Sequence, residues 1–270
     1  MEKPFKSFTA LVIVIELFRI CVLQIFWTLG NIVPAWATTR AIQESVCSKL
    51  LEGDLWPLGP EEIEQEFSSQ ATSINKTDMP TAIKALVASG EFRPGEKNLD
   101  IGGGRFDNVT EFLDERGIKN YTYDPFNRTR AHNQAVVAKA SGAKVDTVTI
   151  NNVLNVIQER DNWTRVLLQA EHALRPGGKI YIQIYEGKKD WTRAKRERFQ
   201  VLASKGQWGK IFREAGAGPT TAESWQNKLP IEAYLPFVQD FFPNARIVRF
   251  TYKTARGKKS IKLIVAEKVF

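Results

Sequence analysis

The chain has 270 residues, of which 43% are hydrophobic and 25% charged, a composition typical of a globular protein with a sizeable core. Its two cysteines and two histidines are too few for a disulfide framework or a histidine-rich metal centre, so no metal site is expected. The net charge of +8 is concentrated in residues 188–270, which carry 18 Lys and Arg against 7 Asp and Glu.

Residues 1–37 form a hydrophobic N-terminal segment. Residues 20–37 contain no charge and approach the roughly 20 residues that span a bilayer. Within 8–37 the two charged residues, Glu16 and Arg19, are spaced to pair on one helix face. We expect a helix that anchors the protein in a membrane. Two alternatives stay open: a helix that packs on the main domain, and a cleaved signal peptide that ends near Ala37.

Residues 38–95 are expected to be a helical lead-in to the main domain. Apolar residues recur at helical spacing in 41–51, the stretch 56–60 interrupts this pattern with proline and glycine, and the acidic run 61–66 predicts another short helix. Pro80, followed by the apolar residues of 82–87, is typical of a helix with proline in its first turn.

From residue 96 onward, strands and helices alternate regularly. The pattern predicts strands at 98–101, 118–123, 146–151 and 179–185, separated by helices at 108–116, 128–140 and 162–174. Two further strands, 246–252 and 261–269, are predicted to form an antiparallel hairpin. This alternation is typical of an α/β domain with a mostly parallel, doubly wound sheet.

A glycine turn follows the first predicted strand, where Asp100 and Ile101 precede Gly102, Gly103 and Gly104. Glycine allows positive φ and lets a ligand approach the main chain closely, and the helix after the turn offers free N–H groups. Asp124 ends the next strand, 22 residues after Gly102, at the spacing where an acid binds both ribose hydroxyls of a nucleoside. The pattern therefore predicts a nucleoside-cofactor site.

Four motifs in residues 96–187 stand in a recognisable order: Asp100 with its glycines, Asp124, the strand 145–148 leading into Asn151, and the turn Leu174-Arg175-Pro176-Gly177-Gly178-Lys179. Together they resemble the class I S-adenosylmethionine-dependent methyltransferases. The resemblance implies a Rossmann-like domain over 96–270 with an antiparallel last strand. It also implies an enzyme that binds S-adenosyl-L-methionine through Asp100, Gly102, Gly103, Gly104, Asp124, Phe126 and Asn151.

Two features depart from the family pattern. Phe106 stands where the family has the third glycine of its turn. Asp124 and Asp146 are separated by 22 residues, and one predicted helix fills most of that length, so the usual third strand is expected to be short or missing around 142–145. The acid that holds adenine in this family is then expected within 144–146.

Asn152 and Glu186 are the candidates for a catalytic role. Asn152 lies where the methyl group of the cofactor points in this family, and its amide is suited to orienting an acceptor. Glu186 ends the next strand and is a candidate base, which is needed only if the acceptor loses a proton. In-line approach and charge placement otherwise provide most of the catalysis in such a transfer.

Residues 188–230 form a basic section that is expected on the acceptor side. Nine basic residues and four aromatic residues lie within 188–213, a composition that binds nucleic acid, rests on anionic lipid, or forms a solvated helix over 192–202. Neither cysteine follows a proline, and 151–154 contains no proline pair, so the familiar DNA-base chemistries are disfavoured.

We therefore expect a cytoplasmic catalytic domain, held at a membrane by its N-terminal segment, that methylates a small molecule. Two alternatives stay open. One is a nucleic-acid methyltransferase that uses 188–213, and the other is a non-catalytic cofactor-binding or membrane-attached regulatory protein.

Overall fold

The computed structural model describes residues 55–72, 77–187, 191–254 and 257–269. The hydrophobic segment 1–37, with the expected membrane helix, and the first part of the lead-in lie outside these residues. Within the described ranges, no helix is both long enough and apolar enough to cross a bilayer.

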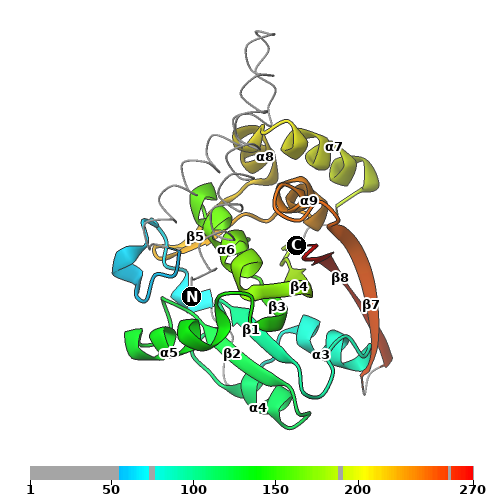
Figure 1. Ribbon diagram of the computed structural model, residues 1–270. Helices are drawn as coiled ribbons and strands as arrows, with labels where there is room; N and C mark the ends of the chain where they lie inside the picture. The colour runs from blue at the N-terminus through cyan, green and yellow to red at the C-terminus, as the bar shows by residue number, and fades with distance from the viewer. Residues whose placement is uncertain (1–54, 73–76, 188–190, 255–256, 270) are drawn as a thin grey trace, which may run out of the picture.

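A six-stranded mixed sheet forms the centre of the domain (Figure 1). Its order is β2-β1-β3-β4-β8-β7, in which β2, β1, β3 and β4 are parallel and β8 is antiparallel to both β4 and β7. The expected α/β sheet with an antiparallel C-terminal hairpin is confirmed. The strands are β1 (Lys97–Ile101), β2 (Lys119–Tyr123), β3 (Val145–Asn151), β4 (Leu174–Gln183), β7 (Arg246–Thr254) and β8 (Gly257–Glu267).

Helices pack on both faces of the sheet. On one face, α5 (Arg130–Ala140), α6 (Arg160–Ala173) and α9 (Ile231–Gln239) share a core with the side chains of Leu99 and Ile101. On the other face, α3 (Thr81–Ala88) and α4 (Asn108–Asp114) form a smaller core with the C-terminal hairpin. Because successive strand residues point to opposite faces, Asn98 and Asp100 of β1 point toward the second face.

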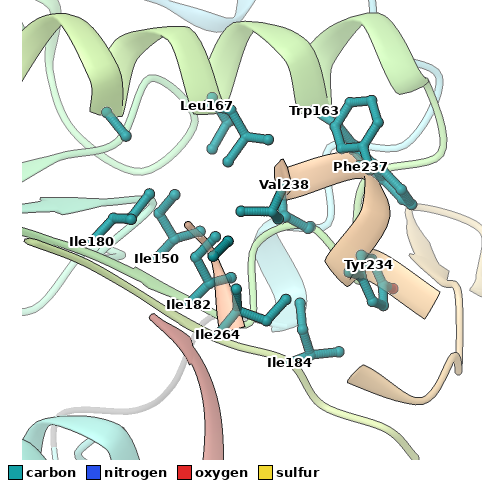
Figure 2. Close-up of a cluster of buried hydrophobic side chains, with 14 of the residues drawn as sticks. Ile150, Trp163, Leu167, Ile180, Ile182, Ile184, Tyr234, Phe237, Val238 and Ile264 are labelled. Carbon is teal, nitrogen blue, oxygen red and sulfur yellow. The ribbon is translucent and has the colours of Figure 1, made fainter. Parts of the chain in front are cut away.

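Trp163 of α6 packs beside Phe237 in the larger core (Figure 2). Its fully buried ring lies 5.1 Å from the ring of Tyr234 and 5.5 Å from that of Phe237, both on α9. Leu167 and Val238 continue this packing toward the strand side chains Ile150, Ile180 and Ile182. This packing fixes the position of α6, which lines the pocket described below.

The turn predicted at 175–178 is part of a strand irregularity. Leu174 already pairs with Val145, and Lys179 pairs with Thr147, so the four residues between them bulge out of the ladder. A Cβ on Gly178 would lie 2.9 Å from the carbonyl oxygen of Asp146, which explains the need for glycine.

The chain from β2 to β3 contains α5 and no strand, so β2 is an edge of the described sheet. The short or missing third strand is thus confirmed.

The described part of the lead-in is less helical than expected. Where the acidic run predicts a helix, the structure has the single turn η2 (Pro60–Glu62), followed by η3 (Gln70–Thr72). Residues 63–69 are irregular, because their side chains and backbone contact neighbouring segments of the domain instead of forming helical turns. The helix after Pro80 is present as α3.

The basic section contains two helices, α7 (Arg193–Ser204) and α8 (Trp208–Ala215), followed by the hairpin of β5 (Gly218–Thr221) and β6 (Ser224–Gln226). The helix predicted over 192–202 is confirmed, and the Thr192 side chain caps it by accepting a hydrogen bond from the N–H of Lys195.

Candidate active site

A pocket opens at the carboxyl ends of β1, β2 and β3. Because these strands are parallel neighbours, the residues that follow each of them meet at one edge of the sheet. Asn152, one of the two catalytic candidates, lines this pocket. All seven residues predicted to hold the cofactor line it as well: Asp100, Gly102, Gly103, Gly104, Asp124, Phe126 and Asn151.

The glycine turn forms one wall of the pocket. Gly102 and Gly104 have φ values of 72° and 77°, which side chains rarely tolerate. A Cβ on Gly103 would lie 2.6 Å from Oδ2 of Asp100 and 2.7 Å from Cγ2 of Thr122. The turn therefore presents bare main chain to a ligand.

Asp100 is a buried carboxylate beside this turn, with 1% of its surface exposed. Its Oδ1 accepts hydrogen bonds from the Thr149 hydroxyl at 2.8 Å and from Nδ2 of Asn151 at 3.0 Å. Burial raises the pKa of Asp100 to about 6, because the charged form loses its hydration.

Asp124 organises the loop that follows β2. Its Oδ1 accepts from the backbone N–H groups of Phe126 and Asn127 at 3.0 and 2.9 Å, and its Oδ2 accepts from the N–H of Gly104 at 2.9 Å and from Nδ2 of Asn127 at 3.1 Å. Burial raises the pKa of this carboxyl above its ordinary value, although these donors oppose the shift.

Asn151 and Asn152 end β3 in different conformations. Oδ1 of Asn151 is buried and has no hydrogen-bond partner among the described residues. Asn152 has a φ of 59°, and Gln183 of β4 holds it twice: the N–H of Asn152 donates to the Gln183 carbonyl at 2.9 Å, and Nε2 of Gln183 donates to Oδ1 of Asn152 at 3.2 Å.

The lead-in forms a second wall of the pocket, which the sequence did not indicate. Ser69 fixes this wall, because its hydroxyl donates to the carbonyl of Val156 at 3.0 Å and its N–H donates to the carbonyl of Glu223 at 2.9 Å. Polar side chains of α6 face the pocket as well. The lining residues missed by sequence reasoning include Pro57, Ile63, Gln65, Ser68, Ser69, Thr72, Asn162, Arg165 and Gln169.

The acid expected to hold adenine is not supplied by 144–146. Asp146 lies at the amino end of β3, whereas the pocket lies at the carboxyl end. There its carboxylate accepts from the N–H of Lys97 at 2.8 Å and from Nε of Arg175 at 2.7 Å. Asp146 therefore has a structural role: it holds the start of β1 and the bulge of β4 against β3.

Glu186, the second catalytic candidate, lies outside the pocket lining. Arg196 of α7 donates to both of its carboxylate oxygens, at 2.8 and 2.7 Å, and the N–H of Ile231 donates to Oε1 at 2.8 Å. Arg196 also pairs with Glu232 at 2.6 Å. This ion-pair cluster joins α7 and α9 to the end of β4, and among the described residues 191–230 none lines the pocket.

We expect Arg196→Gln to lower the free energy of unfolding by about 2 kcal/mol, because the partly buried carboxylate of Glu186 loses its cation and Glu232 keeps only its pair with Lys262. Arg193→Gln is the matched control, since Arg193 on the same helix is 92% exposed and pairs with Glu197 at the surface. Chemical denaturation of both variants measures the difference. Equal stability of the two would show that the cluster contributes nothing.

The fold and the site define a class of protein, since a mostly parallel α/β sheet with a glycine turn and an acid at adjacent strand ends is typical of Rossmann-like domains. A family model described as a methyltransferase domain matches residues 75–216, which is more than half of the chain. The chain therefore belongs to this family of S-adenosylmethionine-dependent methyltransferases, as the motifs indicated.

Solved structures give weaker similarities. Phosphoethanolamine N-methyltransferase 2 of Haemonchus contortus, solved with S-adenosylhomocysteine and phosphomonomethylethanolamine, is 16% identical over 56% of this chain, with a TM-score of 0.33. The match covers 40% of that enzyme. A Methanosarcina mazei S-adenosylmethionine-dependent methyltransferase is 15% identical over 68% of this chain and 97% of its own, with a TM-score of 0.43. A comparison with curated proteins gave no match.

Proposed function

We propose that this protein transfers a methyl group from S-adenosylmethionine to a small-molecule acceptor in the pocket at the ends of β1, β2 and β3. The observation that carries the proposal is the convergence of the glycine turn, two buried acids and two asparagines from three strands on that one pocket. The cofactor would supply an electrophilic methyl group on a sulfonium, and the chain would bind and orient both reactants.

The pocket residues fit the parts of this cofactor. Gly102 to Gly104 offer bare main chain for the methionine portion, and Oδ2 of Asp100 with the unpartnered Oδ1 of Asn151 suits its ammonium. Asp124 suits the ribose hydroxyls, which would replace the side-chain amide of Asn127 on Oδ2. Phe126 supplies an aromatic surface beside the ribose site for the adenine ring.

A small acceptor is favoured by the charges around the pocket. Among the described lining residues Arg165 is the one cation, and Asp100 and Asp124 are the acids. The cations of α7 at Arg193, Arg196 and Arg198 pair instead with carboxylates of the same domain. The described part of the lining thus lacks the row of cations that a nucleic-acid backbone requires.

Asn152 is the group that we propose to orient the acceptor. Gln183 donates to its Oδ1, and this contact leaves the Nδ2 group of Asn152 as a donor. No residue of the described lining besides the two acids is a ready base, so the proposed contribution of the protein is alignment and exclusion of water.

Labelling tests this proposal directly. The full-length protein would be incubated with S-adenosylmethionine bearing a deuterated methyl group and an extract of its native cells. We expect the label in the small-molecule fraction by mass spectrometry, and none with the Asp124→Asn variant. Label in nucleic acid would support the alternative through 188–213, and calorimetry showing tight NAD binding without S-adenosylhomocysteine binding would overturn the cofactor assignment.

A further inference from the structure

Buried neutral side chains of β1 and β3 form a row of hydrogen bonds on the α4 face of the sheet. The hydroxyl of Thr147 donates to Oδ1 of Asn98 at 2.8 Å. Nδ2 of Asn98 donates to the hydroxyl of Thr149 at 3.1 Å, and that hydroxyl donates to Oδ1 of Asp100 at 2.8 Å. Each of these four residues is at most 3% exposed, so the row is shielded from water.

The number of protons on each side chain shows which group donates and which accepts along this row of hydrogen bonds. Asn98 has two amide protons, which go to Oδ1 of Asn120 at 2.8 Å and to Thr149. A threonine hydroxyl has one proton, and because Thr149 accepts from Asn98 it gives its own proton to Asp100. The row therefore ends on the carboxylate, where each donor polarises the next.

The two carboxylate oxygens of Asp100 have different surroundings. Oδ1 receives Thr149 and Asn151, whereas Oδ2 lies on the side of the glycine turn, close to where a Cβ of Gly103 would stand. We infer that Thr149 is a positioning residue for the cofactor: its hydroxyl holds the Asp100 carboxylate ionised, with Oδ2 directed at the α-ammonium of the methionine portion. This inference rests on the proposed function. It concerns a residue that is not among those lining the pocket.

The other charges near Asp100 are independent of Thr149. Asp124 at the end of β2 opposes ionisation of Asp100, and Arg128, just before α5, favours it. Nε of Arg128 is bound to the carbonyl of Gly104 at 2.7 Å, and its Nη1 pairs with Asp107 at 2.8 Å. Because no hydrogen bond joins the hydroxyl of Thr149 to Asp124 or Arg128, its removal changes the hydrogen bonds of Asp100 and Asn98 and leaves these two charges in place.

The chain provides a matched pair of variants. Thr149→Val and Thr147→Val each replace a buried threonine of β3 by an isosteric residue, and each leaves one polar atom of Asn98 unpaired. They therefore carry a similar packing and hydrogen-bond cost, but the first alone removes a donor from Asp100. Thr149→Ser keeps the hydroxyl and is the rescue variant.

The experiment measures the Kd of S-adenosylhomocysteine by calorimetry between pH 5.5 and pH 9 for the full-length protein and the three variants. We expect Thr149→Val to bind about tenfold more weakly at pH 7, because without this donor the pKa of Asp100 rises and less of the carboxyl is ionised to bind the ammonium. The deficit should shrink to less than about twofold at pH 9, because the carboxyl then ionises without this donor. Thr147→Val and Thr149→Ser should stay within about twofold of the unmodified protein.

A deficit of Thr149→Val that is equal at every pH, or an equal deficit of Thr147→Val, would overturn the inference, because packing would then explain it. If Thr149→Val does not fold, Thr149→Ala replaces it with Thr147→Ala as its control, and the same pH dependence is required. If the unmodified protein does not bind S-adenosylhomocysteine at all, the proposed function fails, and this result is distinct from unaltered binding by the Thr149 variant.

Discussion

Asp124→Asn is expected to weaken the binding of S-adenosylhomocysteine by about 100-fold, since two ribose hydroxyls lose a charged acceptor and each such hydrogen bond contributes about 1.5 kcal/mol or more. The carboxylate is 5% exposed, so water cannot readily replace it. Titration calorimetry measures the effect, and the melting temperature of the variant shows whether the domain remains folded.

The loop after β2 supplies the control for this result. Asn127→Ala removes the side-chain amide that shares Oδ2 of Asp124, but it keeps the carboxylate and the backbone donors of the loop. We expect this variant to bind within about threefold of the unmodified protein. A loss as large as that of Asp124→Asn would mean that loop order, and not ribose recognition, depends on Asp124.

The affinity for S-adenosylhomocysteine is expected to fall about tenfold between pH 7 and pH 5. Burial raises the pKa of Asp100 to about 6, so this group is mostly ionised at pH 7 and mostly protonated at pH 5. The α-ammonium of the ligand binds the ionised form of Asp100, so binding weakens as the pH falls through the pKa of this group in the free protein. The ammonium of the ligand remains charged throughout this range, so it adds no titration of its own.

Asp100→Asn tests the assignment of this pH dependence. The variant keeps a carbonyl oxygen for the donors Thr149 and Asn151, but it carries no charge at any pH. We expect weaker binding at pH 7 and a flat profile between pH 7 and pH 5, because the group that titrates in this range is gone. Asp114→Asn, an exposed change on α4, is the control. An unchanged profile in Asp100→Asn would place the titrating group elsewhere.

The residues of the candidate cofactor site could be predicted from the sequence, because the features that mark them depend on short stretches of chain. Gly102 and Gly104 need positive φ, and this need is a property of the turn itself. Strand periodicity placed Asp100, Asp124 and Asn151 at the ends of their strands, and parallel pairing then brings strand ends to one edge. All seven expected residues accordingly line one pocket.

Two interpretations of the sequence were misleading, because the charge and position of a residue do not show which side chains it pairs with in the fold. Glu186 was a candidate base by its place after a strand, but Arg196 reaches both of its oxygens from a helix ten residues further along the chain. The basic section was expected at the acceptor side, whereas the three arginines of α7 pair with Glu197, Glu186 and Glu214. A run of cations shows nothing about the carboxylates that the fold places against it.

The sequence by itself determined the α/β class, the strand ends that carry the polar residues, the closing hairpin and the missing third strand. These features follow from periodicity, glycine conformation and chain length, which are local. The tertiary structure alone decided that Ser69 and its neighbours wall the pocket, and that Thr149 contacts Asp100 from 49 residues away in the chain. Such contacts depend on which strands and loops become neighbours, and no short stretch of sequence encodes that pairing.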